Sequence, residues 1–183
     1  MKQQKTALFV LRLSLTLLMI TALVAAALAG INAITAPVIA QLQAEKTQAA
    51  VEQVLPGGGT LLESYSDETG LVQAVYTSQE GYAIQVTPAG FDGTINMMVG
   101  VDTQGKVLGV TIISHTETAG LGAVAAADNT AGEAFRGSFT GASGQVSLAK
   151  DGGSIDAITG ATITSRAVTQ GVNAALACAA GLS

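Results

Sequence analysis

The chain has 183 residues and a formal net charge of −5, and hydrophobic residues make up 49% of it. This length suffices for a membrane segment and one compact domain of roughly 130 residues. The excess of acidic residues argues against a nucleic-acid partner, and a lone cysteine, Cys178, with one histidine argues against a transition-metal or iron–sulfur site. Any redox chemistry in this chain would therefore require an organic cofactor.

The N-terminal part contains a long apolar run, residues 13–34, without a charged residue. As a helix this run would extend over about 33 Å, enough to cross the hydrocarbon core of a membrane. Lys2, Lys5 and Arg12 precede it, whereas all the acidic residues follow it. By the positive-inside rule, we expect residues 1–12 in the cytoplasm, 13–34 as a single transmembrane helix in contact with lipid, and the rest on the extracytoplasmic side of the cell (inner) membrane.

A cleaved signal peptide is the alternative for this segment. It would explain the basic start, the apolar run and a possible cleavage site at Ala27-Leu28-Ala29. The apolar character continues past Ala29 as far as Ile39, which is longer than the apolar part of a typical signal peptide. We therefore favour an uncleaved anchor.

Residues 35–59 are expected to form a juxtamembrane helix, over 40–55, and a linker that begins at the Pro-Gly-Gly-Gly run 56–59. Two pairs of strand-like segments follow, each joined by a short polar turn. They are 71–77 with 82–87, and 94–101 with 107–114. Gly105 lies in the second turn, at a position that requires a positive φ.

Helical and strand-like segments alternate in the remainder of the chain. Residues 122–135 are rich in alanine and are expected to be helical, and residues 145–148 are expected to form a short strand. A loop over 150–153 then leads to a last helix that ends near Ala180. This order predicts an α+β domain over 60–183, with a mostly antiparallel sheet and flanking helices.

The run DAITGATITS, residues 156–165, carries the functional prediction. Gly160 and Ala161 have small or no side chains, and Thr162 supplies a hydroxyl beside them. Thr164 or Ser165 is expected to cap the last helix. Unpaired N–H groups at that helix start favour an anion, most simply a phosphate, next to Thr162. The alternative is an ordinary capped helix after a glycine-containing turn.

This run resembles the flavinylation motif of the FMN-binding domain in the family of RnfG, a component of the Rnf electron transport complex, and NqrC. That motif reads Asp-x-x-(Ser/Thr)-Gly-Ala-Thr. The match is complete at Asp156, Thr159, Gly160, Ala161 and Thr162. The resemblance implies that FMN is bound covalently to Thr162 through a phosphoester, with Thr164 and Ser165 close by. It also implies an ApbE-type flavin transferase that installs the group from FAD.

A second segment, residues 115–122, resembles the family's His-x-Glu-Thr-Pro-Gly-Leu-Gly segment, with Ala119 in place of proline. The resemblance implies that these residues lie near the flavin ring: His115, Glu117, Thr118, Gly120, Leu121 and Gly122. Leu121 is expected to cover a ring face, and Glu117 to lower the reduction potential of the flavin. For His115, a structural role is the alternative.

Lys150 belongs to a Lys-Asp-Gly-Gly run that resembles the family's lead into the attachment motif. We expect its ammonium group to pair with the flavin phosphate, and the alternative is a solvated loop lysine.

The resemblance as a whole implies an electron-carrier subunit with covalently bound FMN in the Rnf complex, a membrane-bound, ion-translocating ferredoxin:NAD⁺ oxidoreductase. Its expected partners are the other membrane subunits of that complex. The chain shows no Gly-x-Gly-x-x-Gly fingerprint in a strand–helix context, so no NAD⁺ or ferredoxin site of its own is expected. The alternatives are a stand-alone, membrane-anchored extracytoplasmic flavoprotein and a membrane-tethered binding module without a redox role.

Overall fold

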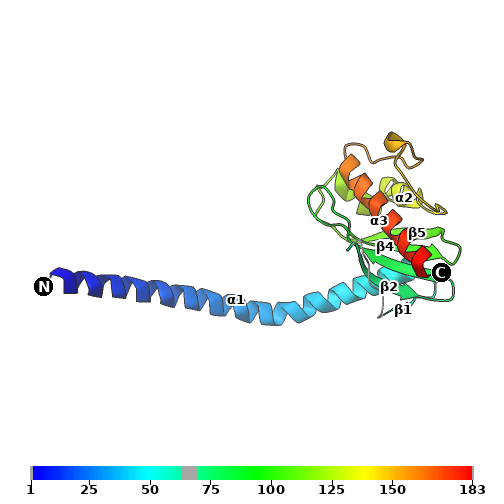
Figure 1. The fold of residues 1–183 in the computed structure, drawn as a ribbon. Coiled ribbons are helices and arrows are strands. Elements are labelled where there is room, and N and C mark those ends of the chain that lie inside the picture. The colour runs from blue at the N-terminus through cyan, green and yellow to red at the C-terminus, as the bar shows by residue number, and fades with distance from the viewer. Residues whose placement is uncertain (1, 63–69, 183) are drawn as a thin grey trace. The chain divides into compact units, whose positions relative to one another are not determined.

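The computed structural model describes residues 2–62 and 70–182, and Figure 1 shows the fold. The chain divides into two compact units, one that ends at Glu45 and one that begins at Lys46. Residues 1, 63–69 and 183 lie outside the described residues, and so does that part of the expected domain over 60–183.

The first helix, α1, spans Lys2–Val54 without interruption. The expected membrane segment 13–34 and juxtamembrane helix 40–55 are therefore parts of one helix, which continues through Pro37 although proline lacks the N–H for a bond one turn back. By length and composition α1 is able to cross a membrane, and the side chains of residues 9–46 are exposed. An apolar surface of this length requires a cover such as lipid.

The second unit contains a five-stranded antiparallel sheet whose strands lie in chain order. The strands are β1 Thr60–Leu61, β2 Val72–Thr77, β3 Gly81–Val86, β4 Asn96–Asp102 and β5 Val107–Ser114. The four predicted strands are confirmed to within two residues at each end, and so is the positive φ of Gly105, at 76°. β1 was missed because two residues are too few to show an alternating pattern.

Helical elements follow the sheet in the chain. They are the 3₁₀ helices η1 Gly122–Ala126 and η2 Ala149–Asp151, and the α-helices α2 Thr130–Gly137 and α3 Thr162–Leu182. The prediction of one helix over 122–135 is wrong. Asn129 lies between η1 and α2 in an extended conformation, and its side chain accepts a hydrogen bond from the Gly132 N–H at 2.9 Å. This N-cap starts a new helix where the sequence pattern suggested continuation.

Alternation along the strands divides the apolar residues between two cores, one on each face of the sheet. In β4, Met97 and Val99 are buried in the larger core, to which α3 contributes, whereas Met98 belongs to the smaller core with Val54 of α1. The last turn of α1 packs closely on the sheet: a Cβ at Gly100 would overlap the Val54 carbonyl oxygen. The α+β class with a mostly antiparallel sheet is thus confirmed.

Candidate functional site

Three segments that are far apart in the sequence meet at one end of the sheet. The β3–β4 connection, which includes Phe91, leads into β4 at this end, and the segment after β5 leaves from it, because Asn96 pairs with Ser114. The start of α3 joins them through a hydrogen bond from the Thr164 hydroxyl to the Glu117 carboxylate. Together with Lys150 of a fourth segment, they line a pocket of about 360 Å³, which we call the α3 pocket.

Helix α3 begins at Thr162, so the hydroxyl singled out by the sequence lies at the first helical residue. The first hydrogen bond of the helix runs from the Ser165 N–H to the Ala161 carbonyl at 2.9 Å. The N–H groups of Thr162, Ile163 and Thr164 precede that bond and therefore have no acceptor within the helix. These donors and the positive end of a 21-residue helix favour an anion at this point.

The predicted capping role of Thr164 or Ser165 is wrong, because both residues lie inside the helix. The Thr164 hydroxyl instead reaches Glu117 in another segment. The Ser165 hydroxyl donates to the Ala161 carbonyl at 2.9 Å and accepts from the Ile158 N–H at 3.0 Å. Ser165 therefore holds the turn that leads into the helix, below the pocket surface.

Gly160 lies two residues before Thr162, the first residue of α3, and has a left-handed φ of 76°, which residues with a side chain disfavour. A Cβ at this position would lie 3.0 Å from Leu121 Cδ2 across the pocket. The backbone conformation therefore favours glycine here, and the close approach of Leu121 Cδ2 adds to that preference.

The loop that carries Lys150 is held at its base by an isolated parallel bridge between Leu148 and Ile155, both of which are buried. The predicted strand over 145–148 is wrong: this single bridge is the pairing the structure records for that stretch. The predicted loop over 150–153 begins within the 3₁₀ turn η2. The bridge brings the tip of the loop to the start of α3.

At the tip of this loop, Lys150 Nζ donates a hydrogen bond to Thr162 Oγ1 at 3.3 Å. The neighbouring Asp151 accepts two hydrogen bonds from Arg166 of α3, at 2.8 Å from Nε and 2.7 Å from Nη2. These bonds hold the pKa of Asp151 below its ordinary value. The bidentate pair therefore ties the lysine-bearing loop to the first turns of α3 at any pH above the normal range for a carboxyl group.

Apolar side chains with large exposed fractions surround the pocket. Leu121 is 45% exposed, Ile163 51% and Phe91 66%. The sequence reasoning named Leu121 but missed Phe91 and Ile163 as lining residues. The available signal was weak: Phe91 lies in a glycine-containing connection between two strands, and loops of this kind run over the surface.

The structure brings most of the predicted site residues to this pocket. Those that line it are Glu117, Thr118, Leu121, Gly122, Lys150, Gly160, Ala161, Thr162 and Thr164. Those that do not line it are His115, Gly120, Asp156, Thr159 and Ser165. Asp156 and Thr159 lie on the loop before α3, and both are exposed. His115 is half-buried, and its Nδ1 accepts a hydrogen bond from the Glu117 N–H at 3.1 Å, a contact that shapes the loop.

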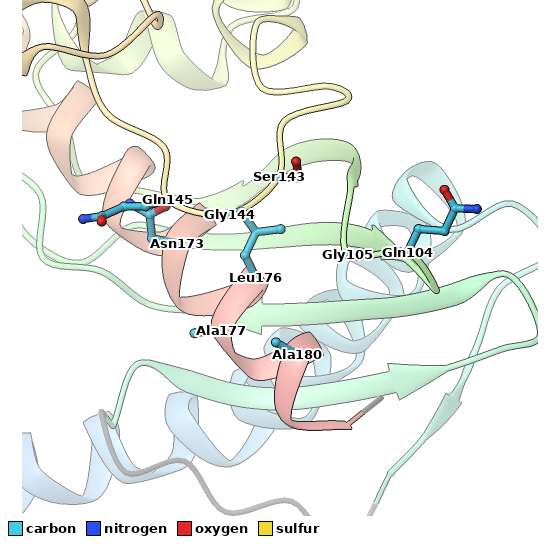
Figure 2. A pocket seen from close by; sticks show the side chains of 9 residues that line it. All are labelled: Gln104, Gly105, Ser143, Gly144, Gln145, Asn173, Leu176, Ala177 and Ala180. Carbon is cyan, nitrogen blue, oxygen red and sulfur yellow. The ribbon is translucent and has the colours of Figure 1, made fainter.

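A larger pocket, of about 550 Å³, lies between the second half of α3, the β4–β5 turn and residues 143–145 (Figure 2). None of the described residues that line it is charged, and the amide of Asn173 is already bound to both backbone groups of Val146, at 2.8 Å each. The α3 pocket is smaller, but it combines a hydroxyl, an ammonium group and apolar walls. It is therefore the better candidate for a functional site.

Comparison with known proteins agrees with this choice. Residues 90–177 match the model of the FMN-binding domain, a span that contains every residue lining the α3 pocket. The G subunit of the Na⁺-translocating ferredoxin:NAD⁺ oxidoreductase complex of Acetobacterium woodii is 33% identical, over 90% of this chain and 88% of the relative. The G subunits of the ion-translocating oxidoreductase complexes of Stutzerimonas stutzeri and Methanosarcina acetivorans are 33% and 30% identical, over 89% and 88% of this chain and 78% and 89% of the relatives.

The fold and the pocket thus define a protein with an FMN-binding domain that follows an N-terminal apolar helix. The identity extends through both parts, over most of the length of each relative. The chain belongs to the family of G subunits of ion-translocating oxidoreductase complexes, as the resemblance of its motifs predicted.

The residues of the α3 pocket fit the cofactor that this domain binds. A volume of about 360 Å³ lies within the range of small-molecule sites, and the exposed apolar side chains at its rim suit an aromatic ring system. The Lys150 ammonium group and the N–H groups at the start of α3 suit a phosphate.

Proposed function

We propose that this chain is the electron-carrier subunit of an ion-translocating ferredoxin:NAD⁺ oxidoreductase, with FMN bound through a phosphoester to Thr162. The observation that carries the proposal is the contact of 3.3 Å between the Thr162 hydroxyl and the Lys150 ammonium group in a pocket with apolar walls. The names of the relatives support the assignment to such a complex. Bound FMN exchanges one or two electrons at a time, so it links one-electron carriers to two-electron carriers.

Five residues of the pocket have distinct parts in holding the cofactor. Thr162 provides the oxygen of the ester, and Lys150 neutralises the negative charge of the phosphate beside it. Phe91 and Leu121 provide apolar surface for the ring and keep water from it. Gly160 leaves room between Leu121 and the helix start.

Attachment requires a separate enzyme, for which we propose an ApbE-type flavin transferase. In this step a bond forms between Thr162 Oγ1 and the FMN phosphorus of FAD, the phosphoanhydride bond breaks, AMP leaves and the hydroxyl proton passes to solvent. Thr162 lies at the pocket surface, beside the loop that carries Asp156 and Thr159. The exposure of this loop suits recognition of the motif by the transferase.

We propose that residues 1–12 lie in the cytoplasm and that residues 13–34 cross the membrane. Residues 35–59 connect this span to residues 60–183, which form an extracytoplasmic FMN-binding domain. The exposed apolar side chains of α1 and the basic residues before the span support this topology. In this arrangement α1 contacts lipid and the other membrane subunits. A covalent bond prevents loss of the cofactor on a side of the membrane where it is not replenished.

Intact mass and the visible spectrum of the native protein test the proposed function together. We expect one added FMN phosphoester per chain, flavin absorbance, and copurification with the other membrane subunits. Flavin without copurification would favour the stand-alone flavoprotein. An unmodified chain without flavin absorbance would favour the binding module and overturn the proposal.

The proposed sidedness predicts which positions react with a membrane-impermeant thiol reagent. Thr103 lies exposed in the β4–β5 turn, so a Thr103→Cys variant should be labelled in right-side-out vesicles. A Gln3→Cys variant should be labelled only after the membrane is permeabilised. The native Cys178 is buried and gives a low background. The reverse pattern would place the domain in the cytoplasm.

Replacement of Lys150 by methionine tests the proposed phosphate contact. Methionine keeps an apolar stem of similar length but lacks the charge, so we expect about ten-fold slower incorporation of covalent flavin, since a charge-assisted hydrogen bond is lost. The matched control is Lys106→Met, an equal change of charge on an exposed residue outside the α3 pocket. Equal rates for both variants would show that Lys150 is a solvated loop residue. Time courses of flavin fluorescence on denaturing gels provide the measurement.

A further inference from the structure

We infer that Glu117 is a positioning residue that fixes the two apolar walls of the α3 pocket relative to Thr162 through its hydrogen bonds. The inference rests on the proposed function, because it concerns the same cofactor site. It assigns to the Glu117 side chain a role in holding the pocket together, in addition to the effect on flavin potential that the resemblance implies.

The carboxylate of Glu117 joins three of the four segments that line the pocket; the fourth is the loop with Lys150. Its Oε1 accepts hydrogen bonds from the backbone N–H groups of Phe91, at 2.8 Å, and Asp92, at 3.1 Å. Its Oε2 accepts the hydrogen bond from the Thr164 hydroxyl in the first turn of α3. Since Glu117 itself belongs to the segment after β5, one side chain connects the β3–β4 connection, this segment and α3.

The surrounding backbone leaves space for this side chain on two sides. A Cβ at Gly90 would overlap Glu117 Oε1, and a Cβ at Gly122 would lie 2.5 Å from both Glu117 Oε2 and Thr164 Oγ1. A further contact runs parallel to these bonds, because the Thr116 hydroxyl donates to the Asp92 carbonyl at 2.6 Å. The carboxylate therefore fits closely between the backbone at Gly90 and the backbone at Gly122.

Glu117 is 7% exposed, and a buried carboxylate is unfavourable unless its charge is compensated. Neither salt bridge recorded among the described residues involves Glu117. The compensation comes from the two N–H groups, the Thr164 hydroxyl and the positive end of α3. Each of these donors belongs to a segment of the pocket, so the hydrogen bonds that compensate the carboxylate also hold these segments together.

The walls of the pocket depend on this connection because they have little packing of their own. Phe91 is 66% exposed and Leu121 is 45% exposed, so neither side chain is anchored in a core. Their positions follow from the backbone segments that carry them. The N–H of Phe91 is itself bound to Glu117, so loss of the carboxylate frees the wall that is most exposed.

The first test uses the full chain, produced without flavin transferase and solubilised in detergent, and measures hydrogen exchange at the amides of Phe91 and Asp92. Glu117→Ala should accelerate exchange at both amides by about ten- to a hundred-fold, since hydrogen bonds to a charged group are lost. Thr164→Val keeps the shape of threonine but lacks the hydroxyl donor, and it should also accelerate exchange at both amides.

Conservative variants separate a positioning role from an effect of the charge. Glu117→Gln keeps an oxygen that accepts from both amides and an NH₂ group that donates to the Thr164 hydroxyl, and Thr164→Ser keeps the hydroxyl donor. In both variants, exchange at Phe91 and Asp92 should stay as slow as in the wild type. The matched control is Thr169→Val: this buried hydroxyl of α3 donates to the Ser165 carbonyl at 2.9 Å, away from the pocket lining. It should leave the exchange at Phe91 and Asp92 unchanged.

The same variants, loaded with flavin, should differ in visible circular dichroism, which reports how the ring is held. Glu117→Ala and Thr164→Val should lose much of the flavin signal, and Glu117→Gln and Thr164→Ser should regain it. If Glu117→Gln behaves as Glu117→Ala in both measurements, the charge and not the hydrogen-bonding shape matters, and the inference is overturned. Unchanged exchange in Glu117→Ala would also overturn it.

Failure of the proposed function has a different signature. A wild-type chain without flavin on Thr162 would refute the proposed attachment, yet the exchange measurements on flavin-free protein would still report whether Glu117 joins the three segments.

Discussion

Replacing Thr162 by alanine is expected to remove all covalently bound flavin. Alanine has no oxygen to form the ester, and the nearest other hydroxyl on the helix, that of Thr164, is 2% exposed and bound to Glu117. Thr164 is therefore poorly placed to replace Thr162 as the acceptor. A flavin-fluorescent band on a denaturing gel and the intact mass of the purified chain measure the effect, which should be all or none.

The control for this experiment is Thr162→Ser, which keeps a hydroxyl at the start of α3 and should retain covalent flavin. Both variants should unfold at a temperature close to that of the flavin-free wild type, because Thr162 is only half-buried and contributes little to the core. A fluorescent band of normal intensity in the alanine variant would place the attachment at another residue.

Truncation of Phe139 to alanine is expected to give the largest loss of stability, about 3–5 kcal/mol in the free energy of unfolding. The Phe139 side chain is fully buried in the larger core. Its ring meets that of Phe135 edge to face, with centroids 5.4 Å apart and an interplanar angle of 87°. The substitution removes this contact and leaves a cavity. Urea unfolding of the full chain in detergent, followed by tyrosine fluorescence, provides the measurement.

Phe91→Ala is the matched control, because it makes the same chemical change at a side chain that is 66% exposed. We expect the free energy of unfolding to change by no more than about 0.5 kcal/mol. The variant should nevertheless alter the visible spectrum of bound flavin, since Phe91 lines the α3 pocket. Comparable losses of stability in both variants would mean that Phe91 is packed in the folded protein.

Prediction from sequence succeeded where a pattern is local and repeated. The strands that became β2 to β5 were found because apolar and polar residues alternate and short polar turns separate them. Prediction failed where one side chain changes the course of the backbone. Asn129 divides the expected helix over 122–135, and a single bridge at Leu148 replaces the expected strand over 145–148. Such events depend on individual hydrogen bonds and leave no periodic trace.

The sequence by itself determined the class of protein, the apolar N-terminal helix and the hydroxyl on which the proposed attachment depends, because each is written in consecutive residues. Only the tertiary structure decided which side chains share the pocket. It placed Phe91 and Lys150 in one pocket with Thr162, although 71 and 12 positions separate them from it in the chain, and left Asp156 and Thr159 outside. It also showed that Glu117 accepts hydrogen bonds from two other segments. Contacts of this kind arise from strand pairing and helix packing, which bring together residues whose spacing in the sequence carries no information about their distance.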